Sequence, residues 1–174
     1  MEDLSITAFW LALMATAAAT LFYWGYSFGL RLVLRRLATN GGGFTVATFE
    51  RLPDSFGRLG TLATWVAAAS VATSLIARTA ATGRAPYTNM WEFTVAFAGG
   101  VTLFYILFER WYGQRPDRRA SARSLGAFVQ PLTLAMLVAA AVFFPARVQP
   151  LVPALQNKDL LAVHVYTMIL AYSA

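Results

Sequence analysis

The sequence predicts an all-α protein: a polytopic transmembrane helix bundle of about five helices, with the fifth truncated. Apolar residues make up 58% of the chain and charged residues only 13%. The apolar residues form long blocks, whereas a soluble core needs short periodic stripes. Arginines gather between alternate blocks, as they do on one side of a membrane protein. These three observations indicate an integral membrane protein.

Four apolar blocks are long enough to cross a hydrocarbon layer of about 30 Å, which takes roughly 20 helical residues. They occupy residues 6–30, 59–77, 90–108 and 125–144. A fifth block begins at Leu160, and at about 1.5 Å per residue it reaches roughly 22 Å by Ala174, too short to cross. We therefore expect a single transmembrane domain over residues 1–174 that forms the N-terminal part of a longer membrane protein.

Arginines predict the orientation of these helices. The connection between the first and second blocks carries Arg31, Arg35, Arg36, Arg51 and Arg58, and that between the third and fourth carries Arg110, Arg115, Arg118, Arg119 and Arg123. The other two connections hold only Arg78 with Arg84, and Arg147 with Lys158. By the positive-inside rule, the five-arginine segments are cytoplasmic and the N-terminus lies outside, in a cell (plasma) membrane.

Charge and cysteine content exclude several functions. The net charge is +6, but ten of the fourteen basic groups lie in the two five-arginine segments, where anionic lipid attracts them. The lipid bilayer is therefore the expected partner, and nucleic acid is not. Without cysteine the chain has no disulfide, thiolate metal site or nucleophilic thiol.

Local patterns refine the expected bundle. Residues 31–58 are expected to form a surface linker, or alternatively a short amphipathic turn that Pro53 ends. Aromatic residues gather near block ends, so we assign them to the interfacial belt: Phe22, Tyr23, Trp24, Tyr26, Tyr87, Trp91, Trp111 and Tyr112. The pair Gly99-Gly100 is expected to mark a close contact between helices.

The chain has one histidine, His164, inside the last apolar block. A ligating group in a membrane helix is costly and indicates function, and imidazole is a common iron ligand. Small and polar residues share its helical face, so we expect that face to look into the protein, where Thr167 or Tyr172 orients the ring. The alternative is a neutral histidine satisfied by a neighbouring helix.

A polar segment precedes the third block on the same predicted outer side. It reads Gly83-Arg84-Ala85-Pro86-Tyr87-Thr88-Asn89-Met90-Trp91-Glu92-Phe93. Asn89 or Thr88 can cap the helix, and Glu92 at the third helical position complements the helix dipole and closes a capping box. Capping is a sufficient role for these residues; the alternative is that they also shape a binding site.

Three motifs together resemble the CcsA/ResC family of system II cytochrome c biogenesis proteins. In some bacteria members of this family carry the name CcsB, which elsewhere denotes their partner protein. They are the segment 83–93, then Val152-Pro153-Ala154-Leu155-Gln156-Asn157, then His164-Val165-Tyr166-Thr167-Met168-Ile169-Leu170-Ala171-Tyr172. The likeness runs over the whole chain, in helix spacing as well as in motifs. It makes the chain the N-terminal part of a longer haem-handling membrane protein.

The resemblance implies a haem-binding and haem-delivering subunit of a membrane cytochrome c synthase, or haem lyase. Members carry haem b to the outer face and join its vinyl groups to the thiols of a Cys-Xaa-Xaa-Cys-His segment in apocytochrome c. They work with a CcsB/ResB-type partner. His164 matches an axial ligand of the external haem. The family's tryptophan-rich segment and its other histidines are expected after Ala174 or in the partner, so this fragment alone should be inactive.

A haem also needs an apolar slot and cations for its propionates. The outer candidates for the propionates are Arg84, Arg147 and Lys158, and Asn89 and Glu92 would shape the site. His164 ligates one face of the iron, so the sixth ligand is Met90, Met168 or, as we favour, a group from elsewhere. The alternative to a role in the haem site for Arg78 and Arg84 is that they snorkel to the membrane surface and contact lipid headgroups.

Two other classes of protein stay open. One is a small transporter in which His164 moves protons, although transporters more often carry several ionisable groups near the membrane midplane, and the centres of these blocks lack them. The other is a non-catalytic scaffold subunit of a larger membrane complex. A haem-free spectrum of the full-length protein would favour the scaffold.

Overall fold

The computed structural model describes residues 1–39, 46–83, 86, 89–147 and 158–173, and it describes their side chains except at 33–34, 36–39, 46–53, 116–117 and 158–162. The order of elements is α1 (Glu2–Thr39), α2 (Val46–Thr82), α3 (Met90–Tyr112), α4 (Pro116–Phe143) and α5 (Lys158–Ser173). The described residues include no strand. The predicted all-α bundle of five helices is confirmed.

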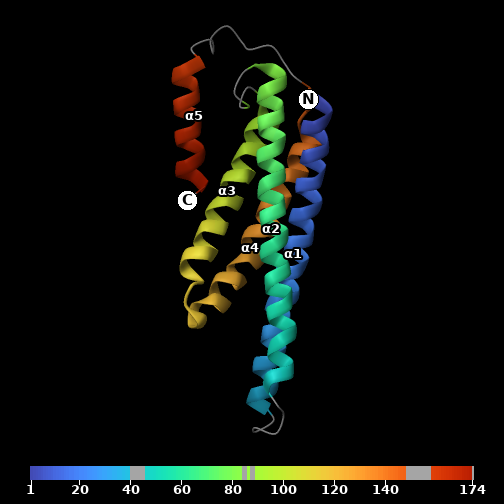
Figure 1. Cartoon of the computed structure of the whole chain (residues 1–174), viewed down its shortest axis with the longest axis vertical. Coiled ribbons are helices and arrows are strands. Elements are labelled where there is room, and N and C mark those ends of the chain that lie inside the picture. The colour runs from blue at the N-terminus through green and yellow to red at the C-terminus, as the bar shows by residue number, and fades with distance from the viewer. Residues whose placement is uncertain (40–45, 84–85, 87–88, 148–157, 174) are drawn as a thin grey trace.

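Figure 1 shows how the helices are arranged. α1 and α2 lie side by side as a long antiparallel pair, α4 passes behind α2, and α5 stands beside α3 on the outside of the bundle. The N-terminus and the beginnings of α3 and α5 lie at one end, called here the N-terminal end. The turn between α3 and α4 lies toward the opposite end, and α1 and α2 continue beyond it. The region around this turn, with Arg58, Arg110, Arg119 and Arg123, is called here the arginine-rich end.

Among the described residues, four helices are long and apolar enough to cross a membrane, as predicted. The spans are Glu2–Leu32, Asp54–Thr82, Met90–Tyr112 and Arg118–Phe143. The prediction for residues 31–58 is wrong where the structure describes them, because α1 continues to Thr39 and α2 begins at Val46 and runs through Pro53; residues 40–45 lie outside the described part. Leucine, arginine and alanine, which fill residues 32–38 almost completely, are strong helix formers, so α1 does not end where its apolar block ends.

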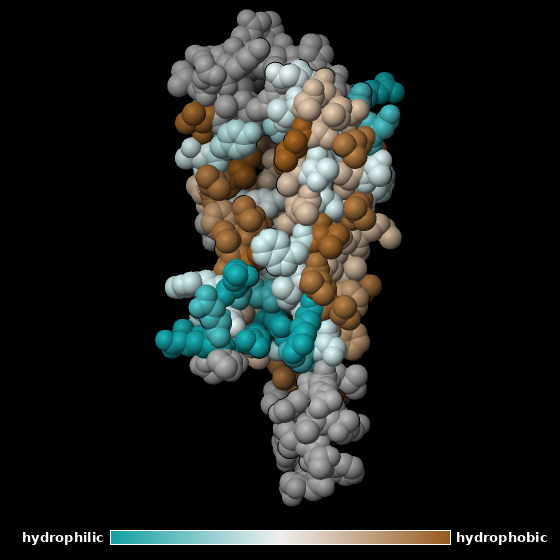
Figure 2. All heavy atoms as spheres, viewed as in Figure 1, coloured by the Kyte–Doolittle hydropathy of each residue, from teal (hydrophilic) through white to brown (hydrophobic). Residues whose placement is uncertain are grey.

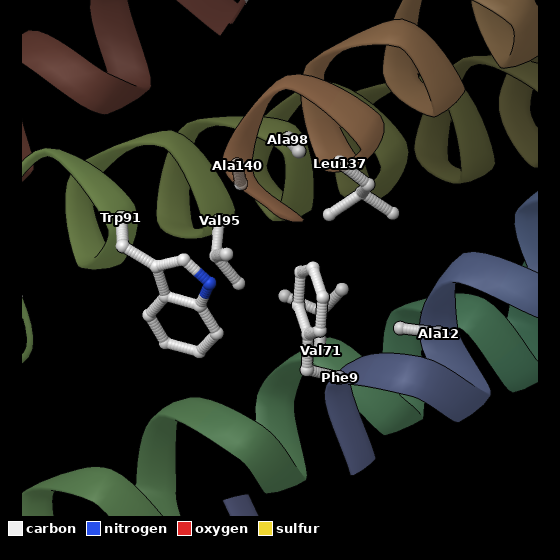
Figure 3. Close-up of a cluster of buried hydrophobic side chains, with 8 residues drawn as sticks. All are labelled: Phe9, Ala12, Val71, Trp91, Val95, Ala98, Leu137 and Ala140. Atoms are coloured by element: carbon white, nitrogen blue, oxygen red, sulfur yellow. The ribbon is translucent and has the colours of Figure 1, made fainter. Parts of the chain in front are cut away.

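α1 to α4 meet in an apolar cluster toward the N-terminal end, shown in Figure 3. Its buried members are Phe9 and Ala12 of α1, Val71 of α2, Trp91, Val95 and Ala98 of α3, and Leu137 and Ala140 of α4. The Phe9 and Trp91 ring centroids are 5.1 Å apart. Three of the eight residues are alanine, which fits membrane helices that associate by close backbone packing rather than by hydrophobic exclusion of water.

Gly99 and Gly100 give α3 two close contacts, which confirms the expectation for this pair. A Cβ atom on Gly99 would lie 2.7 Å from Cγ1 of Val71 in α2, and one on Gly100 would lie 3.1 Å from Cγ2 of Ile169 in α5. Neither space holds even a methyl group without movement. The two glycines therefore let α3 touch α2 on one side and α5 on another.

The assignment to the interfacial belt is wrong for Tyr23, Tyr26 and Trp91, which are buried, and Tyr87 lies outside the described residues. Tyr23 is fully buried and Trp91 is 2% exposed. The Tyr23 ring packs edge-on against Tyr105, with centroids 5.6 Å apart. Both rings find partners within the bundle, so burial is more favourable for them than the membrane interface.

Candidate functional site

The N-terminal end contains a buried ion pair between α2 and α3. Nε of Arg78 lies 3.0 Å from Oε1 of Glu92, and the two side chains are 0% and 1% exposed. The guanidinium carbon of Arg78 lies 4.9 Å from the centroid of the Trp91 ring, and Nη2 donates to the carbonyl of Ala146, just after α4. This one cation therefore connects α2, α3 and the end of α4. Snorkelling of Arg78 to lipid, the alternative given above, is wrong.

Asn89 caps α3 and also positions the segment after α4. It has an extended backbone, and its Oδ1 accepts a hydrogen bond of 2.7 Å from the backbone N–H of Glu92. Its Nδ2 donates to the carbonyl of Arg147 at 3.3 Å. The predicted cap is confirmed for Asn89, while Thr88 lies outside the described residues. The carboxylate of Glu92 has the further role of neutralising Arg78.

Three of the predicted site residues thus come together. Asn89, Glu92 and Arg147 lie at the N-terminal end, and the Arg147 side chain is exposed. Arg84 lies outside the described residues. Lys158 begins α5, but its side chain is outside the described part of the chain.

His164 does not face into the bundle, so the predicted orientation of α5 is wrong. His164, Thr167, Met168 and Tyr172 are all exposed, and Ile169, 7% exposed, lies against α3 instead. The hydroxyl of Thr167 donates to the carbonyl of Val163 in its own helix. The contact is decided by α3, where the missing side chain of Gly100 leaves room for Ile169 and Ser173.

The depth of His164 follows from the same contact. α3 and α5 run in the same direction in Figure 1, and Ser173 lies against Gly100. His164 precedes Ser173 by nine residues, which places it about 13 Å nearer the N-terminal end, level with Trp91. His164 and the Arg78–Glu92 pair therefore lie at about the same height, on different helices.

An apolar hollow of about 490 Å³ lies at this end between α1, Trp91 of α3 and the end of α4. Its walls are Ile6, Phe9, Trp10, Trp91 and residues 141–146. Trp91 and Gly100 are nine residues apart and so point to opposite sides of α3. The hollow therefore lies on the far side of α3 from α5, and it does not form one site with His164.

The arginine-rich end holds a polar network that sequence reasoning missed. The Glu109 carboxylate accepts hydrogen bonds from the Tyr23 hydroxyl at 2.7 Å and from Thr61 Oγ1 at 2.6 Å. Arg123 Nε lies 3.6 Å from the same carboxylate, and Arg123 Nη1 lies 2.5 Å from Asp54 Oδ1. The sequence contained one indication of this network: Glu109 is a carboxylate that directly follows the third apolar block, in the last turn of α3.

The described residues offer one imidazole and no multidentate metal site. No group of three or more His, Asp or Glu side chains comes together within them. His164 is the chain's one histidine, and its ring has no hydrogen-bond partner within the described part of the chain. Its nitrogens are therefore accessible from outside α5.

Curated proteins similar to this chain are cytochrome c biogenesis proteins CcsA from cyanobacteria. The protein from Picosynechococcus sp. is 34% identical over 131 residues, which cover 74% of this chain and 36% of the relative. That from Trichormus variabilis is 32% identical over 131 residues, 74% of this chain and 34% of the relative. The chain thus spans about a third of the length of these relatives. No family model matches the chain, and no solved structure matches it.

Proposed function

Because the chain belongs to the CcsA family of cytochrome c biogenesis proteins, we propose that it is part of a membrane cytochrome c synthase that binds haem b and delivers it to apocytochrome c. The proposed acceptor carries a Cys-Xaa-Xaa-Cys-His segment, and the proposed partner is a CcsB/ResB-type membrane protein. Covalent attachment takes place on the outer face of the membrane, at the N-terminal end of the bundle.

The observation that carries the haem proposal is the position of His164. The ring is exposed, has no hydrogen-bond partner in the described part, and is level with the buried ion pair. Val163, Tyr166 and Met168 around it are apolar and exposed, so they can cover one side of a porphyrin. These residues fit a haem held against the outer face of α5, separate from the hollow beside α1.

Each of the proposed site residues then has a defined role. Bound haem supplies the vinyl groups to which the cysteine thiols add. His164 would ligate the haem iron, and Arg147, Arg84 and Lys158 would hold the propionates through charge-assisted hydrogen bonds. Met168 lies one turn from His164 on the same helix, so it does not reach the opposite side of the iron. This leaves Met90 or, as we favour, a group from elsewhere as the second ligand.

Asn89 and Glu92 are positioning residues in this proposal. Asn89 binds the backbone of Arg147, and Glu92 holds Arg78, whose guanidinium binds the backbone of Ala146. These contacts attach the segment after α4 to the beginning of α3. They fix the backbone that presents Arg147 at the height of His164.

The direct test replaces His164 by Ala in the full-length protein purified with its partner. We expect the Soret absorbance per protein to fall, because one axial nitrogen is lost, and to recover when imidazole is added. Thr167→Ala is the matched control, since Thr167 is exposed on the same helix and, within the described part of the chain, its hydroxyl donates only to the carbonyl of Val163. An unchanged spectrum and unchanged cytochrome c maturation in His164→Ala would remove this residue from the site.

The spectrum also separates the competing functions. A wild-type protein that carries no haem when purified with its partner would favour a scaffold. Haem content that is normal in His164→Ala, together with altered proton movement, would favour a transporter.

The proposed orientation has its own test, because these 174 residues contain no cysteine. Single cysteines at Glu2 and at Gln114, both exposed, mark the two ends of the bundle. We expect a membrane-impermeant maleimide to label Glu2→Cys in intact cells and Gln114→Cys only after permeabilisation. The reverse pattern would place the proposed haem site on the cytoplasmic side.

A further inference from the structure

The arginine-rich end contains a second hollow, of about 580 Å³, between α2, α3 and α4. Four arginines line it: Arg58, Arg110, Arg119 and Arg123. Leu62, Trp65 and Ile106 form its apolar side. Figure 2 shows hydrophilic side chains gathered at this end, directly below a surface of hydrophobic ones.

The positive charge of this hollow exceeds the negative charge beside it. Asp54 is shared between Arg58, at 2.8 Å, and Arg123, at 2.5 Å. Glu109, the second carboxylate, already accepts from Tyr23 and Thr61. Four guanidinium groups against these two carboxylates leave two positive charges.

Arg110 and Arg119 present donors to the hollow without a carboxylate partner among the described residues. Arg110 makes no ion pair within the described part of the chain, and Arg119 Nε reaches only the carbonyl of Gly113, at 3.4 Å. The Nε of Arg123 is buried and lies 3.6 Å from the Glu109 carboxylate, too far for a hydrogen bond. A guanidinium with unused donors binds a phosphate or carboxylate group strongly.

The depth and the walls of the hollow select an amphiphile. Gly113 and Gln114, in the turn between α3 and α4, line its polar side, so this side lies at the end of the membrane spans. Leu62 and Trp65 continue it toward the middle of α2, and they are 62% and 47% exposed. A ligand that satisfies both sides has an anionic head and an apolar tail.

We propose that this hollow binds the headgroup phosphate of an anionic phospholipid from the adjoining leaflet. Arg110 and Arg119 contact the phosphate, and the acyl chains lie along Leu62 and Trp65. Arg123 is held between Asp54 and Glu109 and positions the site from below. A basic pocket between membrane helices is a recurrent means of lipid recognition.

For the test, the full-length protein is placed in nanodiscs of POPC that contain about one-fifth POPG. Native mass spectrometry then counts the lipid molecules that stay bound when the protein is released from the nanodisc. Wild type should retain POPG in preference to POPC. Arg110→Gln and Arg119→Gln should each lower retained POPG about fivefold, the factor expected for one arginine near an anionic surface. Both side chains are exposed, so both variants should fold, and thermal unfolding in the same detergent verifies this.

Arg118→Gln is the matched control. It removes the same charge from the same part of α4, but Arg118 stacks on Tyr112, with 5.2 Å between the guanidinium carbon and the ring centroid, and does not line the hollow. Retention equal to that of wild type in Arg118→Gln supports a defined site. An equal loss in all three variants would overturn it in favour of general surface charge.

A second arm distinguishes the source of the phosphate. In nanodiscs of POPC alone, inorganic phosphate and glycerol 3-phosphate are added to wild type and to the two hollow variants. If the protein retains neither soluble anion, the result supports a phospholipid as the ligand. Retention of either soluble anion that depends on Arg110 and Arg119 would overturn the assignment to lipid, as would haemin displacing POPG. None of these readouts depends on His164, so the proposal stands or falls separately from the haem site.

Discussion

The two ends of the bundle both bury charged side chains, but they surround them differently. At the N-terminal end, Arg78 and Glu92 are 0% and 1% exposed and form a single pair beneath Trp91. At the arginine-rich end, Asp54 is 38% exposed and shares its carboxylate between two arginines beside an open hollow.

This difference separates a structural connection from a binding surface. A fully buried pair recovers its desolvation cost only through fixed geometry, so each partner depends on the other. A partly hydrated network loses less when one member is changed, because water and neighbouring groups replace the contact. The N-terminal end is therefore suited to hold backbone in place, and the arginine-rich end to exchange partners with a ligand.

The largest effect is expected for Glu92→Ala. It leaves the guanidinium of Arg78 buried without its carboxylate, and we expect a loss of about 3–5 kcal/mol in stability. Thermal unfolding of the detergent-solubilised protein measures it. In Arg78→Met with Glu92→Leu no charge is left buried, so most of the stability should return. A Glu92→Ala protein as stable as wild type would contradict the burial of the pair.

Glu109→Ala should have a smaller effect at the other end. The Tyr23 and Thr61 hydroxyls lose their shared acceptor, which costs about 1–3 kcal/mol, while Arg123 keeps Asp54. The same unfolding measurement compares the two ends directly. Equal losses in Glu92→Ala and Glu109→Ala would remove the distinction between a dry pair and a hydrated network.

Tyr23→Phe isolates one contact of that network. The variant keeps the ring against Tyr105 and removes the 2.7 Å hydrogen bond to Glu109 together with the longer, 3.5 Å contact with Thr61, so we expect a loss of about 0.5–1.5 kcal/mol. A double-mutant cycle with Glu109→Ala, which removes the acceptor, tests whether the two residues interact. Additive losses would show that they do not.

The smallest effect is expected for Arg58→Gln. The Arg58 side chain is 71% exposed and its pair with Asp54 is an i,i+4 surface contact, so we expect less than about 1 kcal/mol. Unfolding at low and high salt checks this value, because salt screens an exposed pair. A loss comparable with that of Glu92→Ala would mean that the arginine-rich end is as dry as the other.

Local features of the fold were predictable from the chain alone. The apolar blocks gave the four spanning helices, because length and hydropathy are properties of consecutive residues. Asn89 was predicted as the cap of α3, and Gly99-Gly100 as a close contact, since both effects act within one or two turns. The chain also supplied the candidate list that includes His164.

Only the tertiary structure decided which polar groups meet. Arg78 and Glu92 belong to different helices, as do Tyr23 and Glu109, and nothing in the sequence near either residue states the rotation of its helix. The face that α5 turns toward α3 was likewise decided by space beside Gly100 rather than by the polarity of His164 and its neighbours. Helix formation depends on neighbours along the chain, whereas helix orientation depends on the shape of a surface formed by distant residues.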